Sequence, residues 1–332
     1  MSDQHRGHPP AQRFPHPAPT PYHLMLRTWT YAWWKPVVGV LIAVVGMLVV
    51  APLLFLPVLA VGVAIEGGPF GKSFESAATL KTVTPASLLY LNLVLGSMIF
   101  VTWFVIRFVH RMRPRWLTSV VPRMRWRFFF ACLGLAFVAL LAQVLAGLLV
   151  PGAEGDELAG KLNAFTLSTG LSALVVLLTT PLQAAGEEYL FRGYLLQAFG
   201  SLSRNRWVAI LATALLFAGA HGTQNFPLFF DRFTFGLMAG WLVVLTGGLE
   251  AGIALHILNN FLAFGLALAY GDLSTTLNVS EVSWWNIALT ITQSAVYMLL
   301  VLLVARKMGL QTRTRPPIED PATATGTAVA SA

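Results

Sequence analysis

Long apolar runs separated by short polar segments dominate the chain. Most of these runs approach or exceed 18 residues, enough for a helix to cross the roughly 30 Å hydrocarbon core of a bilayer. The pattern predicts an all-α, polytopic membrane protein with about eight transmembrane helices. The expected helices occupy residues 37–65, 87–109, 128–150, 165–199, 207–221, 229–246, 249–270 and 284–305.

The composition supports this interpretation. Of the 332 residues, 56% are hydrophobic and only 11% are charged, whereas soluble domains contain about 25% charged residues. A soluble class is therefore excluded. The single cysteine, Cys132, excludes a disulfide framework and a cysteine-based metal site.

The formal net charge of +8 is typical of nucleic-acid binding as well as of membrane orientation. Here the cationic residues gather in short segments between apolar runs, as in the cluster over residues 107–127. With the N-terminus inside, the inner segments contain most of the Lys and Arg residues, and the positive-inside rule then places both termini in the cytoplasm. We expect a multi-pass protein of a bacterial plasma membrane, surrounded by lipid and without a nucleic-acid partner.

The same pattern divides the chain into five parts. The ends are polar and rich in Pro, Arg or Thr, which predicts disordered tails. The parts are an N-terminal tail (1–27), the first three helices (28–164), a central core (165–270), the last helix (271–310) and a C-terminal tail (311–332).

Few ionisable or amide side chains interrupt the apolar runs of the central core. A charged side chain at the centre of a membrane helix costs at least about 2.5–3.5 kcal/mol, so such residues usually face the protein interior and mark function. The candidates are Glu187, Glu188, His221, His256 and Asn260.

Helical spacing relates these candidates to one another. Glu188 and Arg192 are four residues apart on one face and predict an ion pair. Glu187 points about 100° away and has no such partner within its own helix, so we expect a buried, unpaired carboxylate. His256 and Asn260 are also four residues apart and share one face of the seventh helix.

Acid, base and amide groups are the components of hydrolysis, in which a carboxylate takes a proton from water and nearby donors stabilise an oxyanion. Glu187, His221 and His256 are equally suited to hold zinc with an open water position. Each residue also has a structural interpretation, as an internal ion pair or as a hydrogen bond between helices.

Three short motifs occur in order within residues 165–270. This set resembles the CPBP intramembrane proteases, a family that includes type II CAAX prenyl endopeptidases and bacterial relatives linked to bacteriocin processing and immunity. The motifs are EExxxR (Glu187, Glu188, Arg192), FxxxH (Phe217, His221) and HxxxN (His256, Asn260).

The resemblance implies an endopeptidase with a peptide or protein substrate, possibly lipidated. Glu187 would activate water, Glu188 would support it, and His221 would share the activation. His256 and Asn260 would stabilise the oxyanion, or His256 would help to bind a metal. Arg192 and Phe217 are then supporting residues of the motifs.

Two further questions stay open at this stage. We favour a site that requires no cofactor, because Asn260 is a poor zinc ligand and no carboxylate that would orient the histidines is evident, although zinc remains an alternative. A proton-coupled transporter would also use buried acids and histidines. A non-catalytic immunity or scaffold protein is the third possibility.

Overall fold

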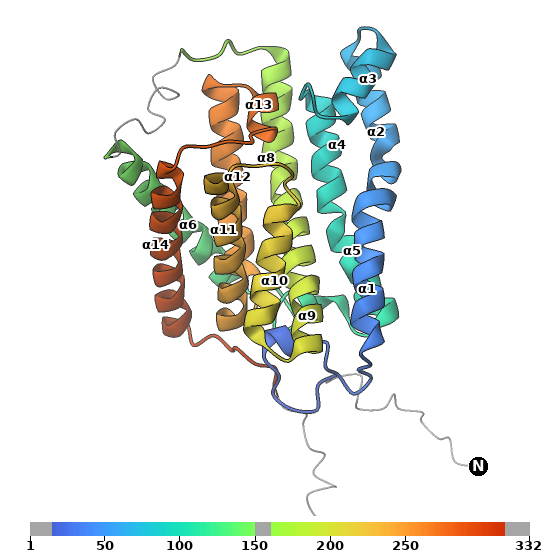
Figure 1. Cartoon of the computed structure of the whole chain (residues 1–332), viewed down its shortest axis with the longest axis vertical. Helices are drawn as coiled ribbons and strands as arrows, with labels where there is room; N and C mark the ends of the chain where they lie inside the picture. Colours follow the sequence, from blue (N-terminus) through green and yellow to red (C-terminus); the bar gives the residue numbers. More distant parts are fainter. Residues whose placement is uncertain (1–14, 150–160, 316–332) are drawn as a thin grey trace, which may run out of the picture.

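The structure is a computed structural model that describes residues 15–149 and 161–315. Figure 1 shows a bundle of long helices, most of which run in nearly the same direction, with the described ends of the chain emerging at the same end of the bundle. Within the described residues the only β-type pairings are two isolated bridges, Pro21 with Arg313 and Ser119 with Gly248. The all-α prediction is therefore confirmed.

The described residues form α-helices joined by short 3-10 and π-helical segments, which are labelled η. In the N-terminal part they are η2 (Tyr22–Leu24), α1 (Trp34–Val45), η3 (Gly46–Val50), α2 (Ala51–Glu66), α3 (Phe70–Ala78), α4 (Pro85–Gly96), α5 (Met98–Phe104), η4 (Val105–Val109), η5 (Pro114–Leu117) and α6 (Trp126–Leu148). In the remainder they are α8 (Leu167–Glu188), η6 (Tyr189–Leu195), α9 (Leu196–Ser203), α10 (Arg206–Gly219), α11 (Phe226–Thr246), α12 (Glu250–Tyr270), α13 (Leu273–Leu277) and α14 (Trp285–Lys307).

Several of these helices join into continuous stretches that are long and apolar enough to cross a membrane. The described residues contain seven: Trp34–Glu66, Pro85–Val109, Trp126–Leu148, Leu167–Ser203, Phe226–Thr246, Glu250–Tyr270 and Trp285–Lys307. The remaining expected span corresponds to α10, whose 14 residues reach only about 21 Å. A helix of that length is shorter than the hydrocarbon core, so α10 is too short to cross it alone.

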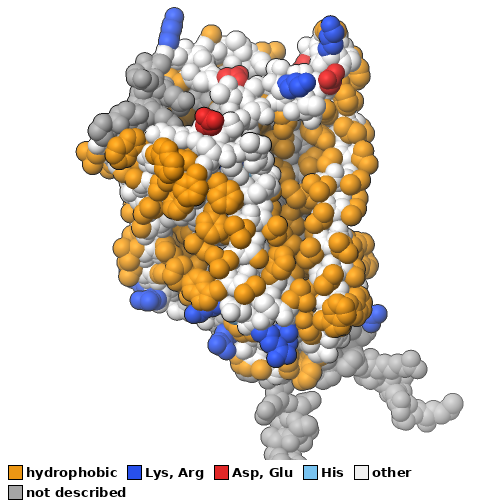
Figure 2. Space-filling view, in the orientation of Figure 1, with side chains coloured by type: hydrophobic (Ala, Val, Ile, Leu, Met, Phe, Trp, Pro, Cys, Tyr) orange, Lys and Arg blue, Asp and Glu red, His pale blue; other side chains and the backbone are white. Residues whose placement is uncertain are grey.

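The surface has the distribution that a bilayer requires. Figure 2 shows a broad band of hydrophobic side chains between a lower end with Lys and Arg and an upper end where the visible Asp and Glu lie together with further Lys or Arg side chains. Large apolar side chains such as Leu48, Phe130 and Leu177 are more than 60% exposed. Exposed apolar surface of this extent is stable only against lipid.

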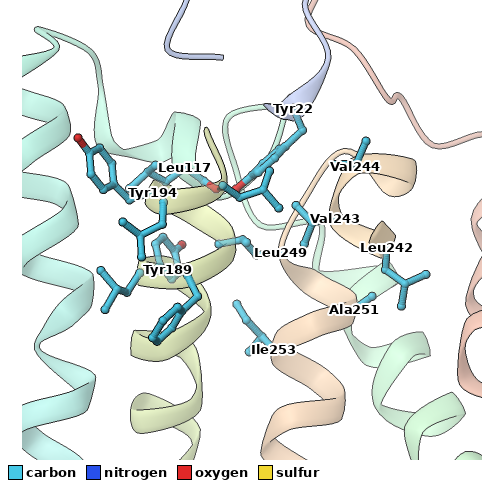
Figure 3. Packing of buried hydrophobic residues seen from close by; sticks show 14 of the residues in the cluster. Tyr22, Leu117, Tyr189, Tyr194, Leu242, Val243, Val244, Leu249, Ala251 and Ile253 are labelled. Carbon is cyan, nitrogen blue, oxygen red and sulfur yellow. Dashed lines mark hydrogen bonds between the residues drawn. The ribbon is translucent and has the colours of Figure 1, made fainter. Parts of the chain in front are cut away.

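The N-terminal segment differs from the tail expected over residues 1–27. Tyr22, Met25 and Leu26 are buried, and the Tyr22 hydroxyl donates a hydrogen bond to the carbonyl oxygen of Leu117. Figure 3 shows Tyr22 and Leu117 within one cluster of packed side chains. The expectation of disorder is wrong for residues 15–27, because these apolar side chains have a core to enter; residues 1–14 lie outside the described part.

The disordered tail expected over residues 311–332 is also wrong in its first part, residues 311–315. The amide of Thr314 donates to the carbonyl oxygen of Thr20 over 3.0 Å, and the Thr314 side chain is buried. The two ends of the described chain therefore pack together at the basic end of the bundle. Residues 316–332 lie outside the described part.

A close helix contact positions the central core. Gly186 of α8 packs against the backbone of α4 at Leu95 and Gly96, where a Cβ atom would collide with the Leu95 carbonyl oxygen. Small residues permit such close approach in membrane helix pairs. The contact fixes the last turn of α8, where Glu187 and Glu188 lie.

Candidate active site

The two adjacent glutamates lie at the junction of two kinds of helix. Glu187 and Glu188 end α8, and the π-helix η6 follows directly. Insertions of this kind widen a helix locally and are frequent at functional sites. Glu188 is fully buried and Glu187 is 8% exposed.

Glu188 forms the predicted ion pair with Arg192. Nη1 of Arg192 donates to Oε1 of Glu188 over 2.8 Å, and both side chains are fully buried. The guanidinium group also lies 4.1 Å from the ring centre of Phe217 and 5.1 Å from that of Phe235. These cation–π contacts give Arg192 a second source of stabilisation inside the bundle.

His256 of α12 lies between the two glutamates. Its Nδ1 atom is 3.1 Å from Glu188 Oε1, and its Nε2 atom is 3.1 Å from Glu187 Oε2. The expectation that Glu187 is unpaired is therefore wrong, because its partner comes from another helix. With the imidazole protonated, His256 and Arg192 neutralise the two carboxylates, which allows all four groups to be buried together.

The start of α12 sets the depth of His256. Leu249, just before this helix, donates its amide to the Thr118 carbonyl oxygen over 3.0 Å. A Cβ atom on Gly193 of η6 would lie 3.6 Å from the Leu249 side chain, so α12 begins level with Gly193. His256 follows Leu249 by seven residues and Glu188 precedes Gly193 by five, so the heights of the two side chains differ by only about 3 Å.

Gln183 is a site residue that the sequence analysis missed. Its Nε2 atom donates to Glu187 Oε2 over 3.0 Å, and its Oε1 atom accepts a hydrogen bond from Asn260 Nδ2 over 2.8 Å. Gln183 thus connects Asn260 to Glu187. Its position four residues before Glu187, on the same helical face, is the signal that could have revealed it.

His221 lies in the turn after α10, with its side chain exposed. Its Nδ1–H group donates to the Phe217 carbonyl oxygen over 2.7 Å, which leaves the Nε2 lone pair free. The Phe217 ring lies between the two histidines, with ring centres 4.8 Å from His221 and 6.0 Å from His256. His221 of the FxxxH motif therefore lies beside the cluster of the two glutamates and His256, and not within it.

Two further hydrogen bonds hold the turn that carries His221. Arg232 of α11 donates to the Gln224 side-chain oxygen over 2.8 Å, and the Gln224 amide donates to the Ala218 carbonyl oxygen over 2.7 Å. These two residues were not among the sequence candidates. Their bonds fix the backbone on both sides of His221.

The metal-binding set proposed from the sequence was Glu187, His221 and His256. In the described residues, no group of three or more His, Cys, Asp or Glu side chains has an arrangement suited to a metal ion. Both ring nitrogens of His256 face carboxylate oxygens, and a nitrogen bound to hydrogen cannot coordinate a metal. The residues as placed do not fit a zinc centre, and the metal dependence stays a prediction.

Fold and site together define a helical, multi-pass membrane protein with a buried cluster of acids and histidine. Residues 169–262 match the family model described as type II CAAX prenyl endopeptidase Rce1-like. This match confirms the resemblance drawn from the three motifs, and it covers the segment that contains the cluster.

One relative extends the similarity beyond this segment. The chain is 25% identical over 217 residues to the uncharacterized protein YyaK of Bacillus subtilis, a match that covers 62% of this chain and 71% of that protein. No solved structure matches the chain. The family match supports an intramembrane endopeptidase activity of the CAAX type and favours neither a transporter nor an immunity protein.

Proposed function

We propose that the protein hydrolyses peptide bonds of membrane-associated or lipidated substrates with a water molecule activated by Glu187. The observation that carries this proposal is the contact of His256 with both Glu187 and Glu188, inside the segment that matches the endopeptidase family. The cluster joins an acid to a charged donor in a place that excludes bulk water. Such an arrangement suits proton transfer and stabilisation of negative charge.

The two oxygens of Glu187 would have different tasks. Gln183 and His256 both contact Oε2, which leaves Oε1 to accept a hydrogen bond from water. His221 would assist through Nε2, because its Nδ1–H group is committed to the Phe217 carbonyl oxygen. Glu187 is therefore the general base in this proposal, and His221 helps to orient the water.

Asn260 and His256 would stabilise the oxyanion of the tetrahedral intermediate. Only one hydrogen of the Asn260 amide is used by Gln183, and the other can donate to substrate. A protonated His256 places positive charge beside the reacting carbonyl. In comparable sites, loss of one preorganised donor such as the Asn260 amide costs about 10²–10³-fold in rate.

The proposed reaction uses no metal ion. The support for this is chemical: an asparagine amide is a weak zinc ligand, and His256 has carboxylates on both nitrogens. Activity should survive a strong chelator. Loss of activity with the chelator and recovery with zinc alone would contradict this part of the proposal.

A proteolysis assay on the purified protein tests the function. The substrates are a prenylated CAAX peptide and a panel of leader peptides, and the variant is Glu187→Gln, which retains size and hydrogen bonding but removes the base. Cleavage should fall by about 10²–10⁴-fold. Glu75→Gln, an exposed acid of α3, is the matched control and should cleave normally. Cleavage by Glu187→Gln at the wild-type rate would exclude Glu187 as the base.

We propose that the basic end of the bundle faces the cytoplasm of a bacterial cell. Both described ends of the chain lie there (Figure 1), together with Lys and Arg side chains (Figure 2). Reporter fusions after Arg315 should therefore report the cytoplasm, and fusions after Asn278 the opposite side. A cytoplasmic signal from both sites would overturn this orientation.

A further inference from the structure

A pocket of about 310 Å³ lies at the basic end of the bundle, away from the acid–histidine cluster. This volume is at the lower end of the range of about 300–1,000 Å³ typical of ligand pockets. The N-terminal segment, the start of α10, the end of α11 and the C-terminal segment meet here. The lining includes Pro21, His23, Arg206, Leu245, Thr312 and Arg313.

The pocket has an excess of positive charge. Arg206 and Arg313 line it, and none of its lining residues is an acid. The sequence has no Asp or Glu in residues 15–35, 200–215 or 305–315, which surround the pocket. Among the residues that the structure describes, no carboxylate therefore neutralises the two guanidinium groups.

His23 is the third polar group and is already desolvated. Its side chain is 8% exposed, and Nδ1 is buried without a hydrogen-bond partner among the described residues. Burial, together with the positive charges of Arg206 and Arg313, lowers the pKa of His23 to about 4. An anion in the pocket would relieve both the repulsion and the missing hydrogen bond.

The surroundings of the pocket indicate which kind of anion it would bind. Arg206 is the first residue of α10, where the helix dipole favours negative charge. Leu245 supplies an apolar wall, and Trp207, 40% exposed beside Arg206, is typical of the membrane interface. A single arginine binds phosphate through two parallel hydrogen bonds, and basic pockets beside transmembrane helices bind anionic headgroups.

We propose that this pocket binds the phosphate group of an anionic phospholipid, with Arg206 and Arg313 as the charged donors and His23 and Thr312 as further hydrogen-bond donors. The lipid would connect the N-terminal segment, α10 and the C-terminal segment. Such a site is separate from catalysis and does not depend on the proposed protease activity. Because it joins three segments, occupancy should also raise the melting temperature.

The test uses the delipidated full-length protein in neutral detergent. Retention of added phosphatidylglycerol or phosphatidylcholine is measured by native mass spectrometry, together with the melting temperature. The wild-type protein should retain phosphatidylglycerol preferentially. The double variant Arg206→Gln, Arg313→Gln should bind it about 30-fold more weakly, since each basic group at a membrane surface contributes roughly fivefold.

The control variant removes the same charge elsewhere. Arg115 and Arg306 are exposed and do not line the pocket, so Arg115→Gln, Arg306→Gln should bind phosphatidylglycerol like the wild type. Because Arg206 and Arg313 are themselves exposed, neither double variant should lose its monodisperse elution profile. A third variant, His23→Gln, should weaken binding while leaving both arginines in place.

Three results would overturn the proposal. Equal losses in the two double variants would show binding to general surface charge. Equal retention of phosphatidylglycerol and phosphatidylcholine by the wild type would show that the pocket does not select a net negative headgroup. Stabilisation by inorganic phosphate, with displacement of the lipid at millimolar phosphate, would identify free phosphate as the ligand instead.

Discussion

Asn260 of α12 donates a hydrogen bond to the side chain of Gln183 on α8, over 2.8 Å. The same glutamine donates to Glu187, so one amide positions both the proposed base and a proposed oxyanion donor. An amide can do this because an acceptor oxygen and a donor nitrogen are bonded to the same carbon atom. Gln183 is therefore a positioning residue, whose effect on the reaction passes through its two neighbours.

Replacement of Gln183 by leucine should reduce kcat more than it reduces stability. Both neighbours would lose a fixed orientation, and misplacement of reacting groups by about 1 Å can cost about 10²-fold in rate. Hydrogen bonds between membrane helices average only about 0.6 kcal/mol, so the melting temperature should fall little. Steady-state cleavage and thermal unfolding in detergent measure the two effects.

The matched control for this variant is Gln293→Leu. Gln293 donates to the side chain of Asn259, also between two helices, over 2.9 Å, but forms no side-chain hydrogen bond with the cluster in the part of the chain that the structure describes. Its loss should leave kcat within a factor of two. A similar fall in kcat for both variants would show that Gln183 acts through helix packing alone.

Glu188 and Glu187 should differ in their effect on stability. Glu188→Gln leaves the buried Arg192 without its carboxylate, and arginine cannot release its proton, so the free energy of unfolding should fall by about 3–5 kcal/mol. Glu187→Gln removes a partner of His256, which can release its proton, and should cost less. Denaturation of Glu187→Gln, Glu188→Gln, Arg192→Gln and the double variant Glu188→Gln, Arg192→Gln provides the comparison.

The double variant is the decisive member of this set. Removing both charges avoids a lone buried cation, so Glu188→Gln with Arg192→Gln should recover part of the stability lost by Glu188→Gln alone. If the double variant is as unstable as the sum of the single variants, the pair does not act as a unit.

Gly252 of α12 should tolerate no side chain. A Cβ atom there would lie 2.6 Å from Glu188 Oε2, and Glu188 is held by Arg192 and His256. Gly252→Ala must therefore displace the carboxylate and break these bonds, with loss of both activity and stability. Gly265→Ala, on the same helix, would meet no atom within 4 Å and should behave like the wild type in both assays.

His23 should make stability depend on pH below neutrality. Its folded-state pKa, lowered to about 4 by burial and by the charges of Arg206 and Arg313, lies below the unfolded value of about 6.5. Between these values the unfolded chain binds more protons. The stability that follows from this pKa difference is fully present above about pH 6.5 and is lost as the pH falls toward 4.

Melting temperatures measured from pH 7.5 to 4.5 without phosphate or added lipid check this effect. Other buried groups titrate in the same interval, so the informative quantity is the difference between the wild type and His23→Gln. The variant should lose less stability on acidification. Parallel curves for the two proteins would show that His23 is not responsible.

The sequence was sufficient for the all-α membrane class and for the residues of the three motifs. Both rest on local information: the length of an apolar run decides whether a helix can cross a bilayer, and spacing of four residues places Glu188 beside Arg192 on one helix. The cost of burying charge then singles out Glu187 and His256 among apolar neighbours. These properties do not depend on how the helices are arranged.

The partners of each site residue were decided only by the tertiary structure. Whether Glu187 is paired depends on the height of α12, which the contact of Leu249 with Thr118 fixes, and no periodicity in either segment encodes that contact. The N-terminal segment is similar, since Tyr22 is ordered by the carbonyl oxygen of Leu117, 95 residues away. Local patterns indicate which side chains share a helix face. Contacts between segments that are distant in the sequence determine which of these side chains meet.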